Sequence, residues 1–481
     1  MNTERQGVNE IPSCHGGLEN LDVEHDYFIE DIEGSLPSDL VGTFVRNGPG
    51  RQRIGGKPYG HWFDGDGMLS QFTFSGATKV HFRNRYIRTP KYLEETAAQK
   101  VLYRGFGTQV PGGFFKNMFR FPANPANTSI VYHANRFLAL NEGGRPWEVE
   151  PGTLDTLGEY DYEGFLKGKS FSAHGKIHPR TGEYFNFGVG MSGAGLRKSP
   201  CLNLYRINAE GKMVAMNDLP LETFPFCHDF ALSDKYAIYF INSILFDGMR
   251  EFFIGTRTMS DGIRFGEDVP MKIMVVDLES LEVIRQFETE PGAIIHFGNA
   301  FEDGDEVVVD GMFQDNFEAN ETLSDVFNSD AKFGGGWYNR YRLNMKDGSI
   351  HCSRVSPYES EFPIFNPAVT GQKHQVTWTA CSVDNGANSF FNGFQKVSYD
   401  GGSQLVTLPL GHYGSEPMFA QAVGSKKEDD GYLLEVVYDA YSHRSELQIF
   451  RADDVEEQVC ALKLPHHLPH QFHGQFLNQV F

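Results

Sequence analysis

The chain of 481 residues is 40% hydrophobic and 14% aromatic, and 41 of its residues are phenylalanine. Its formal net charge of -21 argues against a nucleic-acid partner, because phosphate binding needs a clustered excess of lysine and arginine. The length leaves room for a large core, and large repeat folds often form one closed unit.

The N-terminal sequence MNTERQGVNEIPSCHGG lacks the basic start and the apolar stretch of a secretory signal peptide. No run approaches the roughly 18 apolar residues that a membrane-spanning helix needs. The six cysteines are widely separated and form no C-x-x-C pair, which is typical of free thiols in a reducing compartment. We therefore expect a cytoplasmic protein.

Short β-type runs broken by turn residues recur from about residue 40 to the C-terminus, and KIMVVDLESLEVIRQFETE is one that predicts a hairpin. Four Asp-Gly steps offer the positive φ angles that tight hairpin turns require: Asp303-Gly304, Asp347-Gly348, Asp400-Gly401 and Asp430-Gly431. This pattern predicts an all-β fold, which could be a sandwich, a barrel or a propeller. The length suits a propeller of seven four-stranded blades, formed by residues 1–481 as a single domain.

Two stretches interrupt the strand pattern. Residues 92–127 begin helix-like and become rich in glycine and phenylalanine, so we expect them to form a dome over the β core. The apolar side chains within residues 106–121 predict peripheral contact with membranes, and an ordinary loop packed on the core is the alternative. The second stretch, from Gln314 to Asn339, predicts a long loop between strands.

Four of the 17 histidines lie at or near the start of a β-type run among apolar neighbours: His174 in SFSAHGKIHP, His228 in PFCHDFALS, His296 in AIIHFGNAFED and His473 in HQFHGQF. A charged imidazolium is costly there, whereas a neutral, metal-bound imidazole is not. A single histidine in such a context is more often a core residue than a ligand. The separations of 54, 68 and 177 residues, however, are close to one, one and three units of about 60 residues. If each unit is a blade, all four side chains point to the central axis.

These histidine contexts resemble the ligand motifs of the carotenoid cleavage oxygenases. The likeness covers nearly the whole chain, starting with EDIEGSLPSDLVGTFVRNGPG (residues 30–50) and HWFDGDGML (residues 61–69). Within that family the sequence looks similar to the apocarotenoid-cleaving enzymes of cyanobacteria. The resemblance implies a seven-bladed β-propeller with a helical or loop dome over an axial iron site. It also implies that Fe²⁺ is bound by His174, His228, His296 and His473.

The resemblance further implies which residues surround these ligands. Glu142 in LALNEGG, Glu361 in SEFP and Glu416 in GSEPMF match glutamates that hold the ligand histidines in one tautomer. Thr128 in ANTSI matches a threonine beside the open coordination position. Asn141 departs from the pattern, because that position is tryptophan in the apocarotenoid enzymes and lysine in the stilbene-cleaving relatives. An asparagine offers neither a stacking wall nor a cation, so the substrate class is left open.

The implied reaction is insertion of O₂ across a conjugated carbon–carbon double bond of an apocarotenoid or carotenoid, giving two carbonyl products. The implied partners are an apolar conjugated small molecule and O₂, with no protein partner and no catalytic side chain beyond the iron centre. The alternatives are cleavage of a stilbene, isomerisation without consumption of oxygen, and a non-catalytic propeller that serves as a binding platform.

Overall fold

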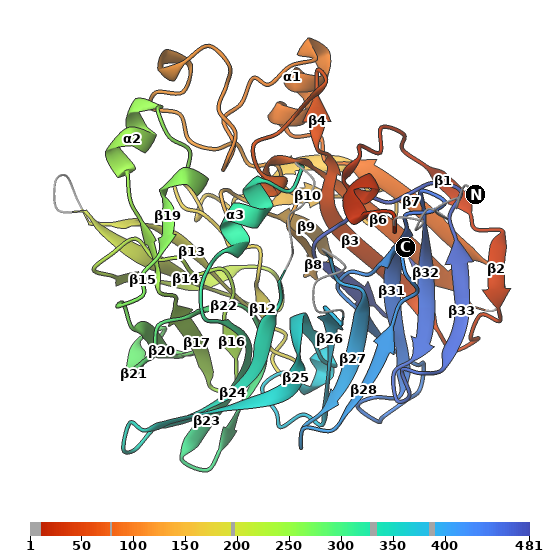
Figure 1. Cartoon of the computed structure of the whole chain (residues 1–481). Coiled ribbons are helices and arrows are strands. Elements are labelled where there is room, and N and C mark those ends of the chain that lie inside the picture. The colour runs from red at the N-terminus through yellow and green to blue at the C-terminus, as the bar shows by residue number, and fades with distance from the viewer. Residues whose placement is uncertain (1–10, 77–78, 194–197, 328–333, 384–389) are drawn as a thin grey trace, which may run out of the picture.

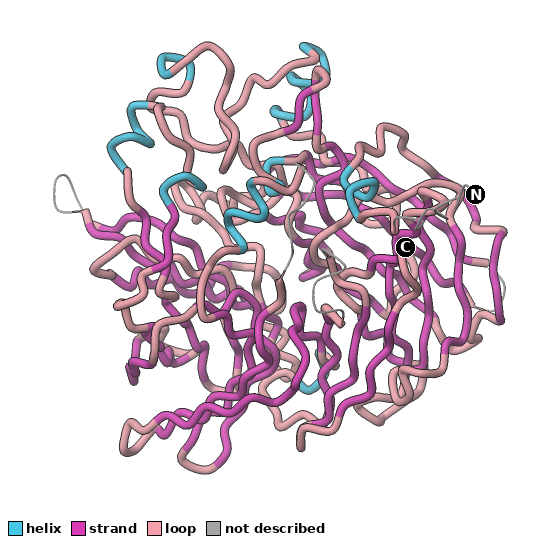
Figure 2. The backbone as a smooth tube through the Cα atoms, in the orientation of Figure 1, coloured by secondary structure: helices cyan, strands magenta, loops and turns pink. Residues whose placement is uncertain are grey.

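A computed structural model describes residues 11–76, 79–193, 198–327, 334–383 and 390–481. The fold is mostly β with few helices (Figure 2), in agreement with the predicted all-β class. The α-helices are short: α1 (Pro90–Ala98), α2 (Met249–Ile254) and α3 (Ala319–Ser324). The 3-10 helices are η1 (Cys14–Leu18), η2 (Trp62–Asp64), η3 (Phe114–Lys116), η4 (Ser260–Gly262) and η5 (Pro367–Val369). No helix in the described part of the chain is long and apolar enough to cross a membrane.

Strands that precede residue 290, together with the C-terminal strand β34, form one five-stranded sheet and three four-stranded sheets. The five-stranded sheet has the order β1 (Asp26–Phe28), β7 (Val80–Tyr86), β6 (Asp66–Ser75), β3 (Val41–Arg51) and β34 (Gly474–Leu477). The next sheet contains β11 (Thr156–Glu159), β10 (Trp147–Val149), β9 (Arg136–Leu140) and β8 (Ser129–His133). The other two contain β12 (Lys176–Ile177), β13 (Tyr184–Ser192), β14 (Ser199–Ile207) and β15 (Met213–Pro220), then β16 (Ala231–Leu232), β17 (Tyr236–Ile241), β20 (Met271–Asp277) and β21 (Val283–Thr289).

Strands that follow residue 290, together with the N-terminal strand β2, form a seven-stranded and a six-stranded sheet. The seven-stranded sheet contains β22 (Ala293–Asp303), β23 (Glu306–Gln314), β24 (Gly336–Asn344), β25 (Ile350–Ile364), β26 (Val376–Cys381), β27 (Gly393–Ser398) and β28 (Ser403–Thr407). The six-stranded sheet has β2 (Asp31–Gly34), β33 (Gln458–Lys463), β32 (Arg444–Arg451), β31 (Gly431–Asp439) and β29 (His412–Tyr413), and β30 (Met418–Gln421) also pairs with β31. Two ribbons join β4 (Arg53–Ile54) to β5 (Lys57–Pro58) and β18 (Ile244–Phe246) to β19 (Ile263–Phe265).

The sheets follow one another around a common centre, so that the colours in Figure 1 run round the molecule from red through green to blue. Strand β20 shows how neighbouring sheets pack. Ile273 and Val275 belong to the apolar cluster shared with β22, β23 and β24, whereas Met274 and Val276 belong to the cluster shared with β13 and β14. Alternate side chains thus face opposite neighbours, which explains why the strand reads as a continuous apolar run.

The ends of the chain interlock in two places. Strand β34 pairs with β3, with Thr43 opposite Leu477 and Arg46 opposite Gly474, and β2 pairs with β33. The contact between β3 and β34 is close enough to require glycine at position 42, where a Cβ would lie 2.2 Å from the carbonyl oxygen of Leu477. The antiparallel pairing therefore brings the C-terminal strand into the same sheet as the first long strand.

Three of the four predicted Asp-Gly turns are confirmed, because Gly304, Gly348 and Gly401 adopt positive φ angles between paired strands. The prediction for Gly431 was wrong, since this glycine begins β31 in an extended conformation. Its Cβ would lie 2.3 Å from the carbonyl oxygen of Ala420, so close strand approach accounts for the glycine.

The two stretches without strand pattern also form local structure. Residues 92–127 contain most of α1 and all of η3, and α1 and α2 lie with the connecting loops at the top of Figure 1, on one side of the sheets. The stretch from Gln314 to Asn339 does connect two strands, β23 and β24, as the sequence predicts. It contains α3, and β24 already begins at Gly336, because that glycine packs against the backbone of Met312 and Phe313 in the neighbouring strand.

The closure of the five-stranded sheet leads to a first prediction about stability. Phe44 on β3 is fully buried, stacks on Phe72 and lies opposite Phe476 of β34. Phe44→Ala is expected to lower the free energy of unfolding by about 3–5 kcal/mol, because it leaves a cavity in this core. Urea denaturation followed by tryptophan fluorescence measures the change.

Phe115→Ala is the matched control, since the Phe115 side chain is 74% exposed. It should alter the free energy of unfolding by no more than about 0.5 kcal/mol. Equal losses in the two variants would show that Phe44 does not belong to a stabilising core.

Candidate metal centre

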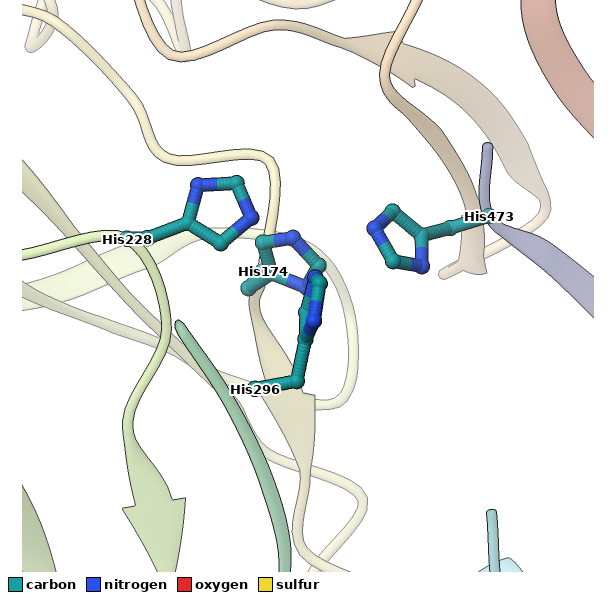
Figure 3. Close-up of side chains that lie close together, drawn as sticks. All are labelled: His174, His228, His296 and His473. Carbon is teal, nitrogen blue, oxygen red and sulfur yellow. The ribbon is translucent and has the colours of Figure 1, made fainter. Parts of the chain in front are cut away.

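Four histidines from different sheets meet at one point (Figure 3). His296 lies on β22, whereas His174, His228 and His473 lie in the segments just before β12, β16 and β34. These last three residues are each only 9% exposed. One ring nitrogen from each of the four histidines lies within 4.8 Å of those from the other three. The structure thus brings together the residues that the sequence singled out.

The rings are arranged around a centre rather than stacked. His228 and His473 face each other from opposite sides in Figure 3, with His174 and His296 between them, and neighbouring ring centroids are 4.4 to 5.3 Å apart. The Nε2 atoms of His174 and His296 are buried and have no hydrogen-bond partner. Nitrogens about 2.1 Å from one ion would lie at most about 4.2 Å apart, so the observed set is only slightly wider than a bound ion requires.

Each of the three predicted glutamates contacts one of these histidines through the ring nitrogen Nδ1. Glu361 lies 2.8 Å from His296, and Glu416 lies 2.8 Å from His473. Glu142 lies 2.5 Å from His228, in an ion-pair contact. A carboxylate on Nδ1 fixes the tautomer in which Nε2 is deprotonated and free to bind a metal.

The three glutamates differ in exposure. The side chains of Glu361 and Glu416 are 7% and 6% exposed, whereas that of Glu142 is 37% exposed. Among the described residues, no carboxylate makes a hydrogen bond or an ion pair with the ring of His174, the fourth histidine. The backbone N–H of His174 donates to Ser172 Oγ at 3.1 Å, and this hydroxyl donates to the carbonyl oxygen of His228.

Burial lowers the pKa of His174 well below its ordinary value, and the positive charge that the neighbouring imidazoles can carry lowers it further. Burial also lowers the pKa of His473, although Glu416 opposes the shift. For His228, burial acts in the same direction, but the carboxylate of Glu142 outweighs burial and the net shift of the pKa is upward. Uncharged imidazole, the form that binds metals, is therefore favoured at His174 and His473.

Thr128 and Asn141 lie next to this group. The backbone N–H of His473 donates to the carbonyl oxygen of Thr128 at 3.1 Å. The side-chain amide of Asn141 donates to Thr128 Oγ1 and to Asn127 Oδ1, each at 3.2 Å. Asn141 is thus part of a small polar cluster and does not present an apolar wall.

Other conspicuous histidines lie outside the group. His178 contacts the carbonyl oxygen of Asp234, and His470 contacts that of Cys14. His466 lies 3.0 Å from the hydroxyl of Tyr27, and His467 stacks on the ring of His443. These contacts are of a kind that supports the fold.

Sequence reasoning did not identify two residues beside the histidines. The ring of Phe362 lies 5.1 Å from that of His296 and 5.4 Å from that of His473, and its φ of +57° is in the left-handed region. Its place directly after Glu361 was a usable signal. Arg46 is 1% exposed and donates hydrogen bonds to the carbonyl oxygen of Phe472, which precedes His473, and to that of Glu416. Its place in the quoted motif FVRNGPG gave no indication of that contact.

Comparison with known proteins identifies the family of the chain. The model of the retinal pigment epithelial membrane protein family matches residues 18–478. The apocarotenoid-15,15'-oxygenase of Synechocystis is 34% identical over 472 residues, with 96% of this chain and 95% of that protein covered. The carotenoid 9,10(9',10')-cleavage dioxygenase of Crocus sativus is 29% identical, with 93% and 85% covered.

Solved structures agree with this assignment. The cobalt-substituted apocarotenoid oxygenase (ACO) of Synechocystis is 32% identical and has a TM-score of 0.87, with 96% of this chain and 98% of that chain covered. The mostly β fold therefore matches an established oxygenase architecture. The chain is an oxygenase that belongs to the family of the retinal pigment epithelial membrane protein and the carotenoid cleavage oxygenases.

Proposed function

We propose that the protein is a non-heme Fe²⁺ dioxygenase that cleaves a conjugated carbon–carbon double bond of an apocarotenoid or carotenoid with O₂, giving two carbonyl products. The observation that carries this proposal is the convergence of four histidine side chains, three of them with a glutamate on Nδ1. The names of the similar proteins support oxidative cleavage of carotenoid-like substrates.

The donor set fits a divalent transition metal. His174, His228, His296 and His473 would hold it through imidazole nitrogens, which suit iron, copper and zinc alike. We propose iron on the strength of the family. Bound iron would supply a position at which dioxygen can be bound and activated. Glu142, Glu361 and Glu416 would keep the ligands oriented and therefore act on the metal indirectly.

The proposed contributions of the polypeptide are binding, orientation and exclusion of water. Thr128 and Asn141 would border the substrate and O₂ pocket. The carbonyl oxygen of Thr128 accepts the N–H of His473, and Asn141 donates to Thr128 and directly precedes Glu142. Cleavage of a hydroxystilbene is the second candidate function, because Asn141 belongs to a polar cluster with Thr128 and Asn127 and presents no apolar wall to a polyene. Besides the iron centre we propose no catalytic side chain.

We also propose that residues 1–481 form one propeller domain with seven blades. Strand β25 pairs with β24 along most of its length and with β26 near its C-terminal end. The seven-stranded sheet can thus be counted as two four-stranded blades that share β25, and together with the other five large sheets this gives seven. Residues 92–127 would then form a dome on the side of α1 and α2.

The apolar residues in this dome support peripheral contact with a membrane. Phe114, Phe115, Phe119 and Phe121 are 45%, 74%, 71% and 69% exposed. Phe253 of α2 continues this surface, because its carbonyl oxygen accepts a hydrogen bond from the N–H of Phe119. Lipid-soluble substrates reside in membranes, so the surface would place the protein near its substrate.

We place the protein in the cytoplasm, which its six free thiols support, and infer no protein or nucleic-acid partner.

Removal of two exposed phenylalanines tests the membrane contact. The double variant Phe115→Ser and Phe119→Ser is expected to bind phosphatidylcholine vesicles at least about tenfold more weakly, because each ring loses apolar contact with the bilayer. Vesicle sedimentation measures the bound fraction. Phe165→Ser is the control, since Phe165 is 48% exposed but lies outside the dome. Equal binding by both variants and the unchanged protein would argue against this surface.

Labelled dioxygen tests the reaction itself. Incubation of the iron-loaded protein with an apocarotenal under ¹⁸O₂ is expected to give two carbonyl products that both carry the label. Mass spectrometry of rapidly trapped products measures the incorporation, and a hydroxystilbene is supplied in parallel. Turnover of the stilbene alone would replace the preferred substrate class, and an unlabelled isomer of the apocarotenal would indicate isomerisation instead of cleavage.

Replacement of the glutamates tests the metal centre. Glu361→Gln is expected to weaken Fe²⁺ binding about 10–100-fold, because the amide no longer holds the Nδ1 proton of His296 with a charge-assisted hydrogen bond. Glu142→Gln should have a smaller effect, since water already reaches that carboxylate and weakens its interaction with His228. Equilibrium dialysis with elemental analysis gives the affinities. Retention of stoichiometric iron by His296→Ala would contradict the proposed site.

A further inference from the structure

Arg46 is a fully buried arginine. All of its side-chain hydrogen bonds go to residues that neighbour His473 and its partner Glu416. Nε and Nη2 donate to the carbonyl oxygen of Phe472 at 3.1 and 2.9 Å. Nη1 donates to Ser415 Oγ at 2.8 Å and to the carbonyl oxygen of Glu416 at 3.0 Å. One guanidinium therefore connects the residue before His473 to the backbone of the glutamate that contacts His473.

Glu416 holds the segment that carries His473 through both of its carboxylate oxygens. Glu416 Oε1 lies 2.8 Å from His473 Nδ1, and Glu416 Oε2 accepts the N–H of Gly474 at 3.0 Å. Because Arg46 lies on β3 and pairs in register with Gly474, the three groups form a closed arrangement of side chain and backbone. Movement of Arg46 would shift His473 relative to Glu416.

The pair of Glu361 and His296 is held differently. Glu361 Oε1 accepts a hydrogen bond from Gln314 Nε2 at 3.1 Å, and Oε2 accepts the N–H of Phe362 at 3.2 Å. These donors are uncharged, whereas the guanidinium of Arg46 is a planar cation with fixed donor directions. The two buried glutamates thus depend on separate supports.

We propose that Arg46 is a positioning residue for the metal centre, which fixes His473 and Glu416 relative to each other by joining the backbone at Phe472 and Glu416. This inference rests on the proposed function, because it assumes that His473 is a metal ligand. Arg46 does not reach the centre itself and acts only through the pair that it holds.

The experiment measures retention of Co²⁺, whose visible absorption reports binding without any turnover. Arg46→Lys keeps the positive charge but replaces the planar guanidinium with a compact ammonium, so the fixed donor directions that join the two carbonyl groups are lost. We expect this variant to release Co²⁺ to a chelator about tenfold faster than the unchanged protein, at the lower end of the effects known for residues that orient metal ligands. Arg46→Gln serves as the second variant should Arg46→Lys fail to fold.

Arg51→Lys is the matched control. Arg51 lies on the same strand, is 6% exposed, and pairs with Asp66 away from the histidine group. It should lower the melting temperature of the metal-free protein as Arg46→Lys does, yet leave the rate of Co²⁺ release within about twofold of the unchanged protein. Equal acceleration in both variants would reduce Arg46 to a general structural role and overturn the proposal.

A double-mutant cycle locates the effect. In a Glu416→Gln background the acceleration by Arg46→Lys should largely disappear, because the contact that Arg46 supports is already broken. In a Glu361→Gln background it should persist at about tenfold, since that pair has its own support. Additive effects in both backgrounds would contradict the proposal. Failure of the unchanged protein to bind Co²⁺ would instead refute the metal centre itself.

Discussion

The site depends on a single physical constraint. Four uncharged imidazole rings must each direct the same ring nitrogen toward the point at which the histidines meet. Imidazole has two ring nitrogens, and a proton on the wrong one would block the centre. The contacts of Glu142, Glu361 and Glu416 with Nδ1 resolve this ambiguity for three of the four rings. Two of these carboxylates are held in turn, Glu361 by the side chain of Gln314 and Glu416 by the N–H of Gly474.

The fold meets this constraint by bringing together parts of the chain that are far apart in sequence. Three of the histidines precede short strands, so their positions depend on how each sheet is placed around the centre. His473 is the extreme case, because β34 reaches its place only by pairing with β3 at the other end of the chain. Closure of the five-stranded sheet and completion of the histidine group therefore depend on the same strand pairing.

Much of the site could be predicted from local sequence, because each histidine and glutamate lies in a short recognisable motif. The mostly β character and three of the Asp-Gly turns also followed from local rules about strands and turns. Gly431 did not, because its reason is the approach of Ala420 from another strand. The contacts of Arg46 could not be predicted for the same reason, since its partners Phe472 and Glu416 lie at the other end of the sequence. Contacts between distant segments leave no periodic trace in either one.

Charge balance explains why an arginine without its own carboxylate can be buried beside this site. A divalent ion in the centre would face three carboxylates, which together carry one negative charge too many for neutrality. Arg46 would supply the missing positive charge beside Glu416, one of the two buried carboxylates. Burial raises the pKa of Glu416, but His473 and, to a smaller extent, Arg46 lower it, and the net shift of the pKa is downward. Glu435 also lies near Arg46, since it accepts the N–H of Ser415, and burial raises its pKa to about 8. In a dry environment an uncompensated charge would cost several kcal/mol, so the arginine and a bound divalent ion would stabilise each other.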